Sequence, residues 1–184
     1  MENRKKQIID LAIKLIQQKG YVGFSYDDIS KQLGVTKASI HYHFEKKVDL
    51  GIAITERLAQ SLKSFEFDSS VSVEKKLMKF IQLQAERFTY SEICPISSLQ
   101  TDFNSLPEVV QKKIEEVSRL ELSIMTELVA EAQSEEILNN TDDKQTVAVT
   151  ILSSIKGALL YRRVLGDDIL PGVINQLNVF LKKS

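Results

Sequence analysis

The chain of 184 residues has few of the residues that interrupt helices or crosslink a fold: three prolines, seven glycines, one cysteine and no tryptophan. Its one cysteine, Cys94, excludes an internal disulfide framework and fits a reducing compartment. No apolar run approaches the ~20 residues that cross a bilayer. Asp10, Lys14 and Lys19 interrupt the first apolar stretch, which therefore does not have the pattern of a signal peptide. We expect a cytoplasmic protein.

Motifs for catalysis and metal binding are also absent. The sequence contains no CxxC, HExxH or GxSxG pattern and no phosphate-cradling glycine loop. Its two histidines, His41 and His43, are two residues apart, so on a helix they point about 200° away from one another. Zinc-binding pairs on a helix stand three or four residues apart instead. We expect no enzyme, no metal site and no cofactor.

Apolar residues at helical spacing are abundant, whereas long alternations of apolar and polar residues are missing. The pattern predicts an all-α fold of about nine helices. The expected ranges are about 3–19, 25–33, 37–44, 48–65, 73–90, 96–104, 107–132, 144–165 and 171–182.

Charge divides the chain unevenly. Residues 1–50 carry nine basic and six acidic side chains, whereas residues 51–184 carry fifteen and nineteen. This asymmetry indicates a basic interaction module on an acidic body. The serine-rich segment "EFDSSVSVE" is the most linker-like stretch. We therefore expect a domain at residues 1–50, a connecting helix at about 48–65, and a second domain at 66–184.

Two short helices near the N-terminus have strong local signals. Ser25 with Asp28 three residues later is a capping pair for the second helix, and Gly34 ends that helix. Thr36 then caps a third helix after only about three residues around the glycine. This arrangement is typical of a helix-turn-helix, in which the second of the two helices is presented outward.

The third helix of the chain carries many hydrogen-bond donors. Once Ile40 and Phe44 are buried, the residues left facing outward are Lys37, Ala38, Ser39, His41, Tyr42 and His43, followed by Lys46 and Lys47. Lysine, hydroxyl, phenol and imidazole groups donate to phosphate oxygens, and a small Ala38 allows close approach to base edges. The alternative for either histidine is that it fills a gap between helices.

The stretch "KGYVGFSYDDISKQLGVTKASIHYHFEKKVDL" resembles the DNA-binding domain of the TetR/AcrR family of bacterial transcriptional regulators. It matches the family pattern at Gly20, Tyr21, Ser25, Ile29, Gly34, Val35, Thr36, Lys37, Tyr42, His43, Phe44, Lys47 and Leu50. The resemblance covers about the first quarter of the chain. The remaining helices match the family only in number, length and order.

The resemblance implies roles for particular residues. Tyr42 and Lys47 would hold phosphates, with Thr36 at the helix N-terminus and Tyr26 beside the second helix. The candidates for base edges are Lys37, Ala38, Ser39, His41 and His43. The chain departs from the family at His41, where tyrosine is usual, at Ile40, where leucine is common, and at Gly51, where a bulky residue is frequent. We expect His41 to change base preference and Gly51 to loosen the fourth helix.

The function that the resemblance implies is a sequence-specific repressor, released from a palindromic DNA operator by a small-molecule inducer. The alternative is a helical protein-interaction module whose basic head binds an acidic partner. Segment 144–165 is apolar on more than one side. In the family the last two long helices form an intersubunit bundle, so we expect a homodimer through about 144–165 and 171–182, with a monomer core as the alternative.

The inducer site is predicted around the segment "SEICPISSLQTDF". Its candidate residues are Phe88, Cys94, Leu99, Phe103 and Tyr161. Apolar stripes at this spacing also suit a filled core. Cys94 is either a thiol sensor or an inert buried cysteine.

Overall fold

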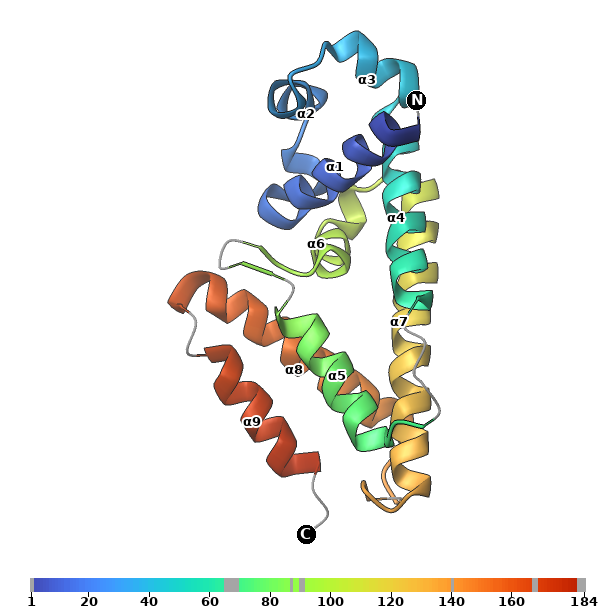
Figure 1. Cartoon of the computed structure of the whole chain (residues 1–184), viewed down its shortest axis with the longest axis vertical. Helices are drawn as coiled ribbons and strands as arrows, with labels where there is room; N and C mark the ends of the chain where they lie inside the picture. Colours follow the sequence, from blue (N-terminus) through green and yellow to red (C-terminus); the bar gives the residue numbers. More distant parts are fainter. Residues whose placement is uncertain are drawn as a thin grey trace. The chain divides into compact units, whose positions relative to one another are not determined.

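The structure, a computed structural model, describes residues 2–64, 70–86, 88–89, 92–139, 141–166 and 169–181. Within these ranges it contains nine α-helices, one 3-10 turn and no strand, which confirms the all-α prediction. The helices are α1 (Glu2–Gly23), α2 (Tyr26–Leu33), α3 (Lys37–His43), α4 (Lys47–Lys63), α5 (Val73–Glu86), α6 (Pro95–Thr101), α7 (Glu108–Ser134), α8 (Lys144–Leu165) and α9 (Ile169–Leu181), with the turn η1 at Phe103–Ser105. Figure 1 shows their order along the chain.

The helices form two compact units. We call Met1–Ser64 with Pro95–Ser118 the head unit, and Phe65–Cys94 with Arg119–Ser184 the body unit. A sequence boundary at residue 66 does not describe this packing, because α6, η1 and the first part of α7 pack with the N-terminal helices. The buried hydroxyl of Ser98 on α6, for example, donates to the carbonyl oxygen of Ile16 on α1 at 2.8 Å.

The head unit is built around α1. Its apolar face packs on α6, α4 and α2, as the 3.6-residue spacing predicts. The fully buried side chains of this core include Ile8, Leu15, Ile16, Phe24, Ile29, Ile40, Leu50, Ile54 and Leu99. The core fixes the positions of α2 and α3, the two short helices of the predicted helix-turn-helix.

The regular helix ends at Gly20, as the sequence suggested, because Gly20 has the non-helical angles φ 79° and ψ 169°. A further helical turn follows this kink and reaches Gly23. A Cβ atom at Gly20 would lie 2.7 Å from the carboxylate oxygen Oδ2 of Asp102. Only glycine fits both this φ and this close approach.

Gly51 does not loosen the fourth helix, which runs unbroken from Lys47 to Lys63. The residue is buried, and a Cβ atom there would lie 3.1 Å from the ring of Tyr21 and 3.2 Å from the side chain of Val110. The absence of a side chain lets α1 and α7 approach α4 closely, so Gly51 tightens the head unit.

In the body unit α8 packs on both α9 and α5. Three buried or partly buried cations lie inside it. Lys156 Nζ is 2.5 Å from Glu121, Lys76 Nζ is 2.6 Å from Glu131, and Arg162 donates to the carbonyl oxygens of Phe88 and Thr89. In the part of the chain that the structure describes, no helix is long and apolar enough to span a membrane.

Candidate nucleic-acid interface

The start of α2 is fixed by the predicted capping box. The Ser25 hydroxyl accepts a hydrogen bond from the Asp28 N–H, and the Asp28 carboxylate accepts one from the Ser25 N–H at 2.8 Å. Lys19 of α1 donates to the same carboxylate at 2.9 Å. The hydrogen bonds from Lys19 and then from Ser25 hold the pKa of Asp28 well below its usual value. The carboxylate therefore stays ionised and ties α2 to α1.

The turn between α2 and α3 is equally local. Gly34 adopts the left-handed conformation with φ 63° and ψ 37°, and both its N–H and that of Val35 donate to the carbonyl oxygen of Ser30. Thr36 caps α3 by accepting the N–H of Ser39 at 3.2 Å. One helix thus ends and the next begins within three residues, as predicted for a helix-turn-helix.

The outward face of α3 has the predicted donors. Ile40 and Phe44 are buried, whereas the side chains of Lys37, Ala38, His41 and Tyr42 are exposed, and those of Ser39 and His43 are partly exposed. Tyr42 is 74% exposed. The Tyr42 ring is therefore accessible to a partner molecule.

His41 lies on this exposed face and does not fill a gap between helices. Its Nδ1 is 2.9 Å from the carbonyl oxygen of Glu45. Because a carbonyl only accepts, Nδ1 carries the proton, and the Nε2 of the neutral ring is an acceptor. The ring also packs edge-on against Tyr26, with centroids 4.9 Å apart. These two contacts fix the direction of the imidazole.

Tyr26 is not available for the predicted DNA contact. Its side chain is buried, and its hydroxyl donates to the carbonyl oxygen of Phe44 at 3.0 Å. Burial raises the pKa of the phenol, which stays protonated as a donor. Tyr26 thus holds the C-terminal end of α3 in place and supports His41 from behind.

Lys47 also differs from the prediction of a phosphate anchor. Its ammonium donates to the carbonyl oxygen of Phe24 at 2.6 Å and lies 4.3 Å from the Phe24 ring centroid and 4.8 Å from that of Tyr21. Burial lowers the pKa of this ammonium. Lys47 faces into the head unit here, where it binds the chain between α1 and α2 through a hydrogen bond and two cation–π contacts.

One contact escaped the sequence reasoning because it joins distant positions. The carboxylate of Asp102, just after α6, accepts the N–H groups of Tyr21 at 2.7 Å and Val22 at 3.3 Å. Tyr21 in turn donates its hydroxyl to the carbonyl oxygen of Lys47 at 3.0 Å, and burial raises its pKa to about 12. Asp102 thus stabilises the kinked turn that borders the base of the helix-turn-helix.

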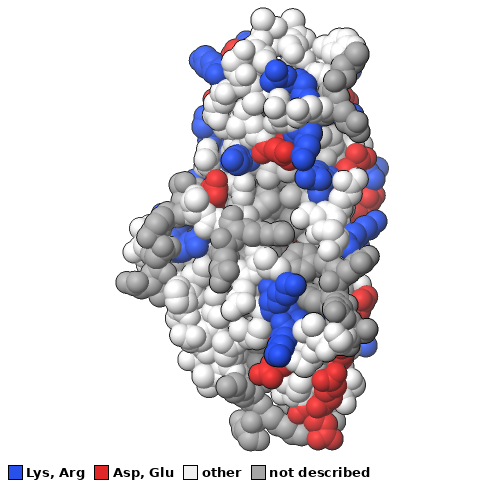
Figure 2. Space-filling model, in the orientation of Figure 1, with Lys and Arg blue, Asp and Glu red and all other residues white. Residues whose placement is uncertain are grey.

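On the face of the head unit seen in Figure 2, over the part of the view that holds α1–α4, basic side chains are interspersed with acidic ones. Lys37 pairs with Asp27 of α2 at 2.7 Å. Lys5 of α1 lies 5.5 Å from the ring centroid of Phe44, which follows α3. The first turns of α1 therefore add positive charge beside the end of α3.

The predicted inducer-site residues are divided between the two units. Leu99 is fully buried on α6 and Phe103 is 37% exposed in η1, both within the head unit. In the body unit Cys94 is buried, Phe88 is partly buried and Tyr161 is 63% exposed on α8. Tyr161 and Phe103 were expected inside a cavity, but their rings face solvent.

Two family models match the chain. The model described as "Bacterial regulatory proteins, tetR family" covers residues 8–54, which hold the whole helix-turn-helix, and the model described as "Tetracyclin repressor-like, C-terminal domain" covers residues 75–175. The second match alone spans more than half of the chain. The protein belongs to the TetR family.

Similar proteins support this assignment over the full length. The chain is 30% identical to a TetR transcriptional regulator from Legionella pneumophila, with a TM-score of 0.82 and 97% of each chain covered. A TetR-family regulator from Agrobacterium tumefaciens is 24% identical with a TM-score of 0.87, covering 99% of each chain. The IcaR protein of Staphylococcus epidermidis, named as a negative transcriptional regulator of the biofilm operon icaADBC, is 27% identical over 97% of this chain and 100% of its own.

Membership in the TetR family confirms the predicted function class. The chain is a DNA-binding transcriptional regulator with an N-terminal helix-turn-helix, and its family is one of regulators rather than of enzymes. The candidate interface of this TetR-family regulator is the outward face of α3. Asp102, Tyr26 and Lys47 lie behind that face and keep the helices in position.

Proposed function

We propose that this TetR-family regulator is a repressor that binds a roughly palindromic operator as a homodimer and leaves it when a small molecule binds. The exposed donor face of α3, on a helix capped and aimed by local contacts, is the observation that carries the DNA-binding part. The repressor part is supported by the relative from S. epidermidis, which is named as a negative regulator.

Within this proposal, α3 lies in the major groove. Lys37, Ala38, Ser39, His41 and His43 face base edges, while Tyr42 and the capped Thr36 N-terminus face phosphates. With Nδ1 bound to the carbonyl oxygen of Glu45, Nε2 is the ring nitrogen of His41 left for DNA, and as an acceptor it would bind the exocyclic amino group of cytosine or adenine. Lys47 reaches a phosphate only if its ammonium leaves the carbonyl oxygen of Phe24.

The homodimer is supported by apolar side chains that remain exposed on the last two helices. Val149, Leu160 and Val164 lie on one side of α8 and Val179 lies on α9, and Val164 is 80% exposed. An exposed apolar stripe of this kind marks an interaction surface in a soluble protein. The same surface on a second copy is a self-complementary partner, which gives a two-fold bundle of four helices.

The first experiment identifies the operator and then separates base reading from phosphate binding. DNA fragments bound from the host genome give the operator, on which variants are titrated beside random duplex. We expect His41→Ala to cost ~1–3 kcal/mol on the operator and little on random DNA. Lys37→Ala should weaken operator binding, whereas the control Lys63→Ala, at the C-terminal end of α4, should not.

The Lys47→Ala variant tests whether the Lys47 ammonium binds a DNA phosphate or stays on the carbonyl oxygen of Phe24 when DNA is bound. A phosphate contact lowers the salt slope of DNA binding by roughly one unit per head in Lys47→Ala. If the ammonium stays on Phe24, the variant instead loses stability with an unchanged slope. Equal binding of wild type to every duplex, with no operator, would contradict the proposal and favour the alternative of a basic head for an acidic protein partner.

The dimer is tested by its mass. We expect twice the 20.8 kDa of the chain in solution, and a monomer for Val164→Asp with Leu160→Asp. Val109→Asp is the matched control, because Val109 is an exposed valine (43%) on α7 in the head unit. A wild-type monomer at micromolar concentration would contradict the proposed bundle.

Release by an inducer requires a ligand that binds the DNA-incompetent state more tightly. A coupling of ~1–3 kcal/mol changes DNA affinity about 5–150-fold. A thermal-shift screen finds ligands, and an operator titration with each ligand measures the coupling. Ligands that stabilise the protein but leave operator affinity unchanged would argue against induced release.

A further inference from the structure

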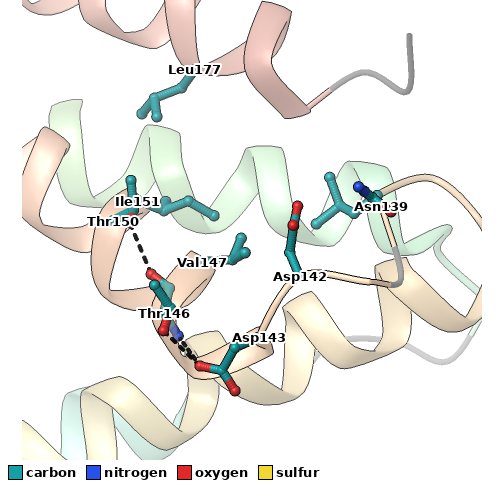
Figure 3. Close-up of a pocket in the computed structure, with 9 residues that line it drawn as sticks. Asn139, Asp142, Asp143, Thr146, Val147, Thr150, Ile151 and Leu177 are labelled. Atoms are coloured by element: carbon teal, nitrogen blue, oxygen red, sulfur yellow. Dashed lines mark hydrogen bonds between the residues drawn. The ribbon is translucent and has the colours of Figure 1, made fainter.

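A cavity of about 390 Å³ lies within the body unit, between the loop that follows α7, the first turns of α8, and α9. This volume falls in the range of small-molecule sites, which is roughly 300–1,000 Å³. Its lining residues are Leu138, Asn139, Asp142, Asp143, Thr146, Val147, Thr150, Ile151 and Leu177 (Figure 3). None of the residues predicted for the inducer site belongs to this set.

The cavity has one apolar side and one polar side. Leu138, Val147, Ile151 and Leu177 form the apolar side, and in Figure 3 the side chain of Leu177 points from α9 toward α8. The polar side consists of the loop and the outward edge of α8. No lysine, arginine or histidine occurs among the lining residues that the structure describes.

The two threonine hydroxyls of the polar side present acceptors, because their protons already bind other oxygens, while Asn139 adds a side-chain amide. Thr146 donates its hydroxyl to Asp143 at 2.7 Å, and Thr150 donates its hydroxyl to the carbonyl oxygen of Thr146 at 2.9 Å. The oxygens of both hydroxyls then offer only lone pairs. In Figure 3 the carboxylate of Asp142 points up the view, toward the side on which α9 lies, whereas that of Asp143 faces the first turn of α8, where it caps the helix.

The loop that carries Asp142 is held in place before any ligand arrives. The side-chain amide of Gln133 on α7 donates to the carbonyl oxygens of both Asn139 and Asp142 at 2.8 Å. Asn139 Oδ1 also accepts from the N–H and the hydroxyl of Thr141. A prearranged acceptor costs little ordering entropy on binding.

We infer that this cavity binds a protonated primary amine that carries a short alkyl chain. The ammonium supplies three donors to the carboxylate and the threonine oxygens, and it neutralises Asp142. The alkyl chain packs on the apolar side formed by Val147, Ile151 and Leu177. The site has no aromatic residue among its described lining, so N–H donation rather than cation–π contact distinguishes its ligands.

The test is a calorimetric titration of the full-length protein with n-hexylamine, in the absence of DNA. We expect saturable binding of one amine per chain. Methylamine has the charge without a long alkyl chain, and n-hexanol has the alkyl chain without the charge. Each should therefore bind at least tenfold more weakly than n-hexylamine. Equal binding of n-hexanol, or no saturable binding of n-hexylamine, overturns the inference.

Variants locate the site. Asp142→Asn removes the charge on the loop and should weaken n-hexylamine binding roughly tenfold, as expected when a hydrogen bond to a charged group is lost. Glu135→Gln is the control, because Glu135 is exposed near the end of α7 and does not line the cavity. An equal loss of n-hexylamine affinity in both variants would mean that the overall negative charge of the region attracts the amine. That result overturns the inference.

A filling variant tests the cavity itself. Thr150→Phe places a ring in the space from an exposed position of α8, so the fold should tolerate it. Binding should be lost while the unfolding temperature stays close to that of the wild type. Undiminished binding in a folded Thr150→Phe protein overturns the inference. Because these titrations contain no DNA, their outcome is separate from that of the proposed repression.

Discussion

The head unit and the body unit satisfy their buried polar side chains in different ways. In the head, buried hydroxyls bind backbone carbonyls: Ser98 to Ile16, Tyr26 to Phe44 and Tyr21 to Lys47. In the body, buried or partly buried charges pair with one another, as in Lys156 with Glu121 and Lys76 with Glu131, and Arg162 binds two backbone carbonyls.

This difference has an energetic meaning. Neutral hydrogen bonds to the backbone fix one helix against another at little desolvation cost. A buried ion pair often contributes less than well-packed apolar residues of the same volume. These hydrogen bonds hold the head helices in one relative position. Recognition of base edges requires such a fixed geometry. The ion pairs inside the body are therefore weak evidence of extra stability.

The largest expected effect comes from breaking a buried pair in the body. Glu121→Ala leaves Lys156 without its 2.5 Å partner and should lower the free energy of unfolding by ~3–5 kcal/mol. Glu116→Ala, which removes an exposed partner of Lys113 on the same helix, should change it by less than ~0.5 kcal/mol. Urea denaturation measures both. Similar losses in the two variants would remove the contrast between buried and exposed pairs.

A smaller effect is expected from Asp102 in the head. Asp102→Ala leaves the Tyr21 N–H without its acceptor, and should cost ~1–3 kcal/mol. Amide hydrogen exchange should speed up at Tyr21 and Val22 in particular. Asp10→Ala is the control, since Asp10 makes only a long, exposed contact with Arg57 at 3.9 Å. Unchanged exchange at Tyr21 would show that the carboxylate does not hold the kinked turn.

Gly51→Ala should destabilise the head by ~1–3 kcal/mol, because the new methyl group meets Tyr21 and Val110 at 3.1–3.2 Å. Calorimetric unfolding measures the loss. A neutral result would mean that the three helices around Gly51 move apart without cost, contrary to the tight packing described for this unit.

Gly157→Ala in the body should have the opposite sign and the smallest size. An added Cβ meets nothing within 4 Å, so the higher helix propensity of alanine should stabilise the chain by ~0.5–1 kcal/mol. Unfolding is measured at several protein concentrations, because a proposed dimer seam runs along this helix. Lower stability at every concentration would contradict the open space around Gly157.

The parts of the head that could be predicted are those whose signals lie within a few residues of one another. Ser25 caps through Asp28, Gly34 turns the chain through Ser30, and Thr36 caps through Ser39. All three features follow from local hydrogen bonding. Once these features placed the start of α3, helical spacing alone predicted which of its residues face outward.

The contacts in the head that were not predicted involve side chains whose partners are far along the chain. Tyr26 and Lys47 were expected to face DNA, and in the structure carbonyl groups 18 and 23 positions away bind them. The carboxylate of Asp102, which binds the turn after Gly20, lies about 80 positions further along the chain. No pattern of neighbouring residues carries this information.

The body was predicted in its helices but not in its cavity. Helix α8 is apolar on several sides, so spacing could not decide which stripe faces inward, and Tyr161 was assigned to the interior although it is exposed. The described cavity depends on a loop between α7 and α8 that the sequence marked only as a gap between helices.

The head unit is made from two stretches of chain, residues 1–64 and 95–118, with contacts such as Ser98–Ile16 that span 82 positions. A ribosome therefore releases the helix-turn-helix well before it releases the segment that buries the other side of α1. At about 5–20 residues per second, the interval between residue 64 and residue 118 lasts roughly 3–10 s. During that time the growing chain exposes the apolar face of α1 and is a target for chaperones. The regulator acquires a complete head only after α5, a helix of the body unit, has already been synthesised.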